Sequence, residues 1–186
     1  MAYENCLDYL RLRGIFPGTV APFCPVDNLI LSVCAYVPWE EAVPTLRDGD
    51  WLPFPQAVEA LTSHPDWDAV GLIMPKDTPT LVVEAARSPR FRPLSLGCCE
   101  HVQDENTQFA ALTYRLPDGT LYLAFRGTDD SLAGWKECFA LSYTTVPDQK
   151  LAQEYLIQVA RRYPGKLRVG GHSKGGNLAV YAATRC

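Results

Sequence analysis

The chain has 186 residues, of which 47% are hydrophobic and 20% charged, so it can bury a substantial core, and its length fits one domain over residues 1–186. A net charge of −4 with scattered basic residues excludes nucleic acid from the expected partners. No apolar run approaches the roughly 18 residues of a membrane span, and the N-terminus lacks the layout of a signal peptide. We therefore expect a cytoplasmic protein without a membrane span.

Seven cysteines, an odd number, lack the paired short spacings and histidine partners of a zinc site. Without an export signal, we expect reduced thiols, most of them small apolar core residues. The sequence predicts neither a metal site nor a cofactor.

The N-terminal region, to about residue 93, is predicted to be helical. Helices are expected over residues 5–13, 26–37, 55–63 and 79–87, with Thr78 as a candidate cap of the last one. Pro38 is expected to end the second helix. The apolar residues of this second helix recur at helical spacing and should face the core: Val26, Leu29, Ile30, Val33, Cys34 and Val37.

From Leu94 the pattern favours β-structure, with strands expected over residues 98–103, 108–116 and 120–125. The Pro117-Asp118-Gly119 turn should join the last two as an antiparallel hairpin. The third strand, TLYLAF, is almost wholly apolar, as expected of a strand buried on both faces.

A polar turn, Arg126 to Ser131, follows this apolar strand, in the position where α/β proteins bind ligands. Helices are then expected over residues 132–143 and 148–163. Asp129, Asp130 or Ser131 can cap the first of these helices, and that structural role explains all three residues.

A glycine-flanked serine stands between a β-type run and a helix-forming run at residues 167–183. Gly171, His172, Ser173, Lys174 and Gly175 spell G-x-S-x-G, the pattern of a nucleophile elbow. In such a turn the serine takes a strained backbone conformation, and the two glycines let strand and helix approach closely. The pattern predicts Ser173 as a nucleophile.

Acyl transfer also needs two donors for a developing oxyanion. One candidate is the N–H of Lys174, which follows the nucleophile. The other is expected in the loop after TLYLAF, where Gly127-Thr128 is well placed. The predicted oxyanion hole therefore consists of Thr128 and Lys174.

Two segments, LAFRGTDDSLAGWKECFALSY and GGHSKGGNLAVYAA, resemble the Mbeg-like family of uncharacterised bacterial lipase-like proteins, an α/β-hydrolase group similar to the class 3 lipases. The segments NCLDYLRLRG and PVDNLILSVCAYV resemble the opening of that family. The resemblance implies an α/β-hydrolase-like sheet with flanking helices, Ser173 as nucleophile, and Thr128 and Lys174 framing the oxyanion hole. It also implies a triad aspartate and histidine downstream of the elbow.

Because the sequence stops at Cys186, we expect an incomplete domain, truncated after the elbow helix. An open sheet edge would then be left through which the protein could associate.

The favoured function is a serine hydrolase acting on a small acyl ester or lipid-like substrate, inactive or weak over these 186 residues. The alternative is a noncatalytic module that binds a ligand or a protein. A third possibility is that His64 or His101 completes the triad from upstream. His172, next to Ser173, is expected to point away and pack, and the Lys174 ammonium to be solvated or paired with a carboxylate.

Overall fold

One open mixed sheet of five strands forms the centre of the computed structural model, which describes residues 5–63, 67, 77–105, 107–128, 141 and 144–186. The strand order is β1-β2-β3-β4-β5. Neighbours are antiparallel except for β4 and β5, which are parallel. The strands are β1 Leu52–Pro53, β2 Ser95–Gln103, β3 Gln108–Arg115, β4 Leu121–Phe125 and β5 Leu167–Gly171.

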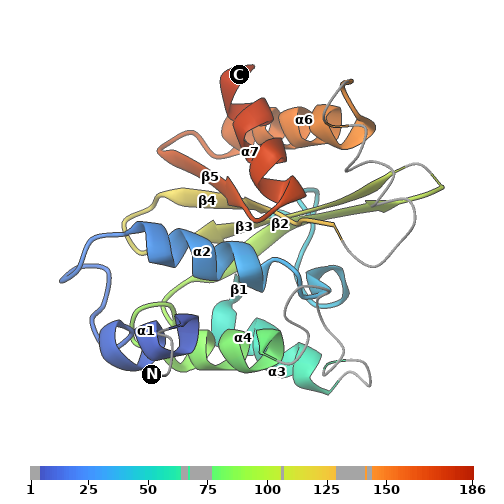
Figure 1. Ribbon diagram of the computed structural model, residues 1–186. Helices are drawn as coiled ribbons and strands as arrows, with labels where there is room; N and C mark the ends of the chain where they lie inside the picture. The colour runs from blue at the N-terminus through green and yellow to red at the C-terminus, as the bar shows by residue number, and fades with distance from the viewer. Residues whose placement is uncertain (1–4, 64–66, 68–76, 106, 129–140, 142–143) are drawn as a thin grey trace.

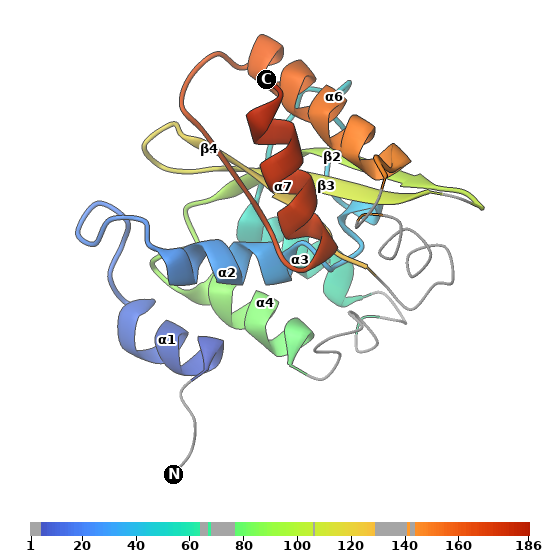
Figure 2. The same ribbon diagram turned by 45° about the horizontal axis from the view of Figure 1, so that its top comes forward.

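Six α-helices in the described part of the chain cover the two faces of this sheet, α6 and α7 on one face and α1 to α4 on the other (Figure 1). Figure 2 shows α6 and α7 side by side. The helices are α1 Cys6–Arg13, α2 Pro25–Cys34, α3 Phe54–Thr62, α4 Thr78–Arg87, α6 Pro147–Arg162 and α7 Lys174–Thr184, with a short 3₁₀ helix, η1, at Trp39–Glu41. None of the described helices is long and apolar enough to cross a membrane.

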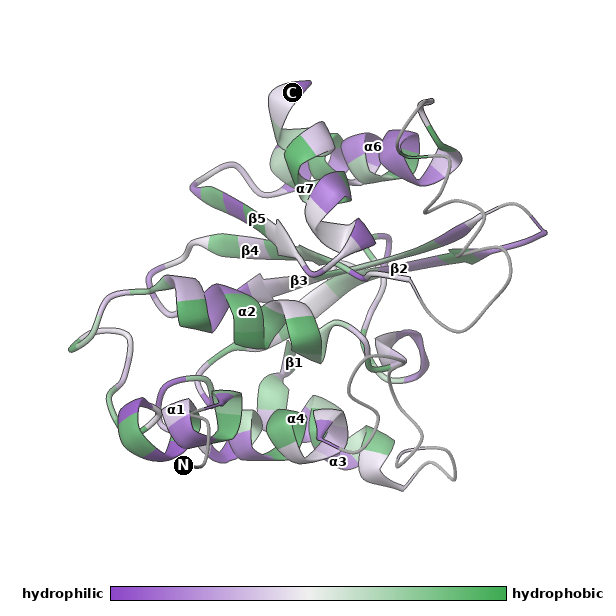
Figure 3. Cartoon of the chain, viewed as in Figure 1, coloured by the Kyte–Doolittle hydropathy of each residue, from purple (hydrophilic) through white to green (hydrophobic). Residues whose placement is uncertain are grey.

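Side chains of β4 alternate between two hydrophobic cores. Tyr122 and Ala124 pack under α1 to α4, whereas Leu121, Leu123 and Phe125 pack under α6 and α7. The strand is therefore buried on both faces, as its apolar sequence predicts. Figure 3 shows hydrophilic and hydrophobic residues alternating along α6.

The predicted hairpin is confirmed. β3 and β4 are antiparallel, with Tyr114 opposite Tyr122, and Gly119 in the connecting turn has a φ of 82° that suits glycine. The N-terminal region, expected to be helical, also contributes the short strand β1 to the sheet.

The first predicted strand begins earlier than expected, at Ser95. A register shift between Gly97 and Glu100 interrupts its pairing with β3, and Cys98 has a φ of 54° there. Such a bulge breaks the alternation by which a strand is recognised in sequence. The N-terminal part of β2 was missed for this reason.

Two predicted helix ends are corrected. The second helix ends at Cys34, not at Val37 before Pro38, and Trp39 Nε1 donates to the Cys34 carbonyl oxygen at 2.8 Å. Thr78 is the first residue of α4 rather than its cap, because the helix begins one residue earlier than expected. The helix expected over 132–143, its candidate caps and His64 lie outside the described residues.

The buried face of α2 also differs from the prediction. Val26 and Leu29 are 36% and 41% exposed, whereas Asp27 is 1% exposed. The reason is an ion pair between Asp27 and Arg90 that turns the carboxylate into the core.

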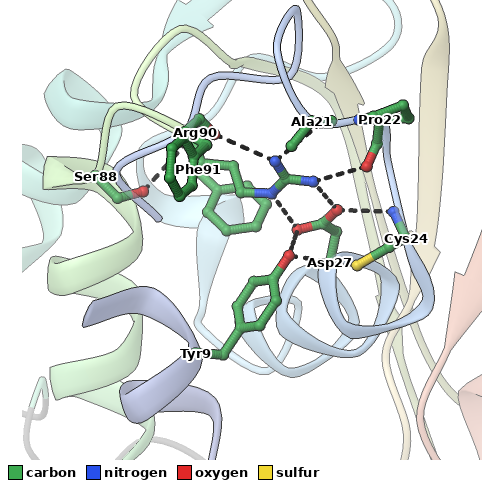
Figure 4. A network of polar contacts seen from close by, with 9 residues as sticks. Tyr9, Ala21, Pro22, Cys24, Asp27, Ser88, Arg90 and Phe91 are labelled. Atoms are coloured by element: carbon green, nitrogen blue, oxygen red, sulfur yellow. Dashed lines mark hydrogen bonds and ion pairs between the residues drawn. The ribbon is translucent and has the colours of Figure 1, made fainter. Parts of the chain in front are cut away.

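Arg90 joins Asp27 to the loop before α2 (Figure 4). Its guanidinium donates to both carboxylate oxygens and to the backbone oxygens of Phe16, Ala21 and Pro22. The two charged side chains are 4% and 1% exposed. A buried pair with its hydrogen bonds satisfied in this way fixes the chain path around it.

Burial alone would raise the pKa of Asp27, but hydrogen bonds from Arg90, the Cys24 N–H and the Tyr9 hydroxyl outweigh it and hold this pKa below its ordinary value. A carboxyl whose folded pKa is lowered adds stability above its unfolded pKa. That stability is lost as the pH falls through the folded value.

We expect Asp27→Asn to lower the free energy of unfolding by about 3 kcal/mol at pH 7, because it leaves the buried Arg90 charge without its partner. The difference from the wild type should shrink as the pH falls below about 4, because the wild-type carboxyl takes up a proton first in the unfolded chain and only at its lowered pKa in the folded protein. Urea unfolding at pH 7 and at a series of values down to pH 3 measures both effects. A difference that stays constant with pH would contradict this account.

Candidate functional site

Ser173 occupies the turn between β5 and α7, with φ 57° and ψ −124°. Among the described residues other than glycine, only Ser173 and Cys98 have a positive φ. This conformation is costly for a residue with a side chain and is typical of functional turns. The serine is exposed, and α7 begins at the next residue. The strained strand-to-helix turn predicted from the glycine spacing is confirmed.

Gly171 and Gly175 allow the strand and the helix to touch. A Cβ added to Gly175 would overlap the Phe125 carbonyl oxygen, and a Cβ added to Gly171 would overlap the Gly175 carbonyl group. Both obstacles are backbone atoms, which cannot rotate away. Glycine at these two positions is therefore required for α7 to pack against β4 and β5.

The Gly127-Thr128 loop lies beside this turn. β4 and β5 are parallel with Phe125 opposite Gly171, so both strands end at the same edge of the sheet. A Cβ on Gly127 would lie 2.7 Å from the His172 carbonyl oxygen, and Thr128 is 5% exposed. The structure therefore brings together the two loops that carry the predicted oxyanion donors.

The N-terminal end of α7 also lies at the serine turn, because this helix begins at Lys174. The Ser173 carbonyl oxygen accepts from the N–H of Gly176 at 3.0 Å and of Asn177 at 3.4 Å, and the His172 oxygen accepts from the Gly175 N–H at 3.0 Å. The N-terminal end of a helix carries a partial positive charge that stabilises nearby anions. Negative charge developing near Ser173 would be stabilised by this end of α7.

The Lys174 side chain is buried and paired, one of the two alternatives expected for it. Its ammonium donates to Asp148 Oδ2 and to the Gln108 carbonyl oxygen, both at 2.7 Å. The side chains of Lys174 and Asp148 are 0% exposed. In the same turns, Gln149 Nε2 donates to Asn177 Oδ1 at 2.8 Å. The first turns of α6 and α7 are thus joined by two polar contacts.

Both described histidines are held by other groups. His172 Nδ1 lies 3.2 Å from the Tyr36 hydroxyl, in the packing role expected for it. His101 Nδ1 lies 3.0 Å from Glu40 Oε1, and Arg126 approaches the same carboxylate at 3.7 Å.

His101 is also distant from Ser173. It pairs with Ala110 in β3, and three strand spacings, roughly 14 Å, separate β2 from β5. A general base must come within about 3 Å of the proton that it accepts, directly or through one water molecule. His101 is therefore too far from Ser173 to act as its base, and the Nδ1 of His172 already contacts the Tyr36 hydroxyl.

Three residues at the site were missed by the sequence analysis: Tyr36, Glu40 and Asp148. Each contacts a residue far away in the chain, and none lies in a recognisable motif. Asp148 stands in the first turn of α6, where an acidic residue is explained by the helix dipole alone. The one sequence feature that could have indicated a buried acidic partner was Lys174, because a cation is unfavourable at the start of a helix.

Among the described cysteines, the buried Cys98 and Cys99 offer no reactive thiol. All six described cysteines are free, and burial raises the pKa of Cys98 to about 11 and that of Cys99 to about 12. Such thiols stay protonated and unreactive at neutral pH. Within the described ranges, no group of three or more histidine, cysteine or acidic side chains could hold a metal ion.

A family model described as Mbeg1-like matches residues 65–186. The matched region includes the Gly127-Thr128 loop, the elbow and strands β2 to β5. No curated protein and no solved structure matches the chain significantly.

We expect Gly175→Ala to destabilise the protein by about 3 kcal/mol, because the added methyl group meets the backbone of β4. Gly18→Ala is the matched control, since a Cβ at Gly18 has no atom within 4 Å, and it should change stability by less than about 0.5 kcal/mol. Chemical denaturation of both variants measures the difference. Equal stability of the two variants would disprove the close approach of α7 to β4.

Proposed function

The chain belongs to the Mbeg1-like family, and from the geometry of its elbow we propose that it is a serine hydrolase acting on small esters or lipid-like acyl compounds. One observation carries this proposal: Ser173 is exposed, has a φ of 57°, and stands directly before a helix N-terminus. Positive φ at a serine is costly, and it is the conformation that a nucleophile elbow needs.

In the proposed reaction, Ser173 Oγ attacks the carbonyl carbon of the ester and loses its proton to a base. The carbonyl oxygen becomes an oxyanion that accepts hydrogen bonds from the backbone N–H groups of Lys174 and Thr128. The alcohol then leaves with a proton, and an acyl-serine remains. Water hydrolyses the acyl-serine, which releases the acid and restores Ser173.

The fold supports this proposal at a coarser level. The described sheet has parallel β4 and β5, with the serine turn and a glycine loop at their carboxyl ends, an arrangement that suits an α/β-hydrolase-like architecture. We further propose a cytoplasmic location, in keeping with the free thiols of the described cysteines. Association through β5, which pairs only with β4 among the described residues, stays a prediction.

The base must come from elsewhere than the two described histidines. The chain contains three histidines, so His64 is the remaining internal candidate. A base outside these 186 residues is the other source, which the resemblance to lipase-like proteins implies. If the base lies outside, this chain should keep only the residual roughly 10³-fold to 10⁴-fold rate enhancement of a hydrolase that lacks its triad.

A noncatalytic acyl-binding module is the second candidate. It is favoured by the contacts of the two described histidines, since His172 faces Tyr36 and His101 faces Glu40. Such a module would bind acyl compounds at the same two loops without forming a covalent bond to Ser173.

We expect a fluorophosphonate probe to label Ser173 and the Ser173→Ala variant to remain unlabelled, because the probe requires a nucleophilic oxygen next to oxyanion donors. Turnover of p-nitrophenyl acetate in the same variant should not exceed the residual rate that binding and the oxyanion donors supply. Ser63→Ala, which removes another exposed serine, is the control and should label normally. Peptide mass spectrometry locates the label.

Labelling at a residue other than Ser173, or turnover by Ser173→Ala above this residual rate, would contradict the proposed reaction. Binding of a fatty acid without any labelling would favour the noncatalytic module. His64→Ala decides the source of the base, because loss of labelling in this variant identifies His64.

A further inference from the structure

The Lys174 side chain breaks two local rules. A cation at the first position of a helix opposes the helix dipole, and a buried ammonium is costly unless it is paired. Yet Lys174 begins α7, and its side chain is 0% exposed. The proposed oxyanion role uses only the backbone N–H of this residue, which any amino acid other than proline supplies. The side chain therefore requires its own explanation.

The ammonium joins the serine turn to two other elements. It lies 2.7 Å from Asp148 Oδ2, in the first turn of α6, and 2.7 Å from the carbonyl oxygen of Gln108, the first residue of β3. β3 runs antiparallel to β4, so Gln108 stands at the same end of the sheet as Ser173. Lys174, the residue after the serine, is thus bonded to both β3 and α6.

A second contact fixes the partner helix in register. Gln149 Oε1 accepts from the Val146 N–H at 3.2 Å, which caps α6, and Gln149 Nε2 donates to Asn177 Oδ1. The first turn of α6 is therefore rigid where it meets α7. Together the two contacts resist rotation and translation of the start of α7.

We propose that Lys174 is a positioning residue for the oxyanion site: its buried bonds to Asp148 and Gln108 hold the first turn of α7, and with it the N–H that follows Ser173. This inference rests on the proposed function. An oxyanion donor acts only if it is held in place before the reaction. A buried ion pair with backbone bonds supplies that rigidity through a side chain that contacts no substrate.

The pair of Arg90 and Asp27 provides a matched control. It is buried to a similar degree, with side chains 4% and 1% exposed. It adjoins a cavity lined by Leu116, Pro117 and Asp118, which precede β4, so it lies at the end of the sheet opposite to Ser173. Loss of either pair removes a buried ion pair, but only one of them touches the serine turn.

The test compares the double variants Lys174→Met/Asp148→Leu and Arg90→Met/Asp27→Leu, neither of which leaves a lone buried charge. Complete loss of an oxyanion donor lowers kcat by about 10²-fold to 10³-fold. A displaced donor should cost less, so we expect kcat for p-nitrophenyl acetate to fall about 10-fold to 100-fold in the first variant, with KM unchanged. The rate of fluorophosphonate labelling should fall in parallel. The second variant should keep the wild-type kcat per folded molecule.

Amide hydrogen exchange gives a readout that does not depend on activity. In the first variant, the N–H groups of Lys174 to Asn177 should exchange faster than in the wild type, whereas those of β3 should be unchanged. Unchanged exchange in this turn overturns the inference, as does an unchanged kcat in a variant that retains activity. If the wild type is not labelled at Ser173, the proposed function fails, and the exchange rates alone decide whether Lys174 positions the turn.

If the first double variant does not fold, the single variant Asp148→Asn replaces it. This substitution keeps the size of the side chain and removes the charge with which Lys174 pairs. A smaller fall in kcat with unchanged KM, together with faster exchange in the first turn of α7, supports the inference. Wild-type values for both quantities overturn it.

Discussion

The close approach of α7 to β4 and β5 is the constraint on which the site depends. It is possible only because Gly171 and Gly175 lack side chains that would overlap the backbone. With strand and helix in contact, the residue between them has no room for ordinary β or helical geometry, and Ser173 takes a φ of 57°. The same contact places the end of β4, and with it Gly127, against the serine turn.

Two buried ion pairs stabilise opposite ends of the sheet. Arg90 and Asp27 are 63 residues apart in the chain and join the N-terminal loop to the segment after α4. Lys174 and Asp148 are 26 residues apart and join α6 to α7 next to the serine. The first pair fixes the chain path in the N-terminal half. The second pair holds the first turn of α7, which carries the N–H proposed to stabilise the oxyanion.

The sequence predicted those features that local pattern determines. The spacing of Gly171 and Gly175 predicted the strained turn at Ser173, and the apolar run of β4 predicted its burial. Features that depend on distant partners were missed. The exposed Val26 could not be foreseen, because Arg90 decides which residue of α2 faces the core. The ion pair of Lys174 with Asp148 was likewise not predicted, because an acidic residue in the first turn of a helix is already explained by the helix dipole.

The central claim is that the serine turn and the Gly127-Thr128 loop form an oxyanion site. A crystal structure of the protein after reaction with a fluorophosphonate tests it most directly. The account predicts phosphorus bound to Ser173 Oγ and its phosphoryl oxygen within about 3 Å of the backbone nitrogens of both Thr128 and Lys174. A phosphoryl oxygen directed into solvent, with neither N–H donating to it, would contradict the account.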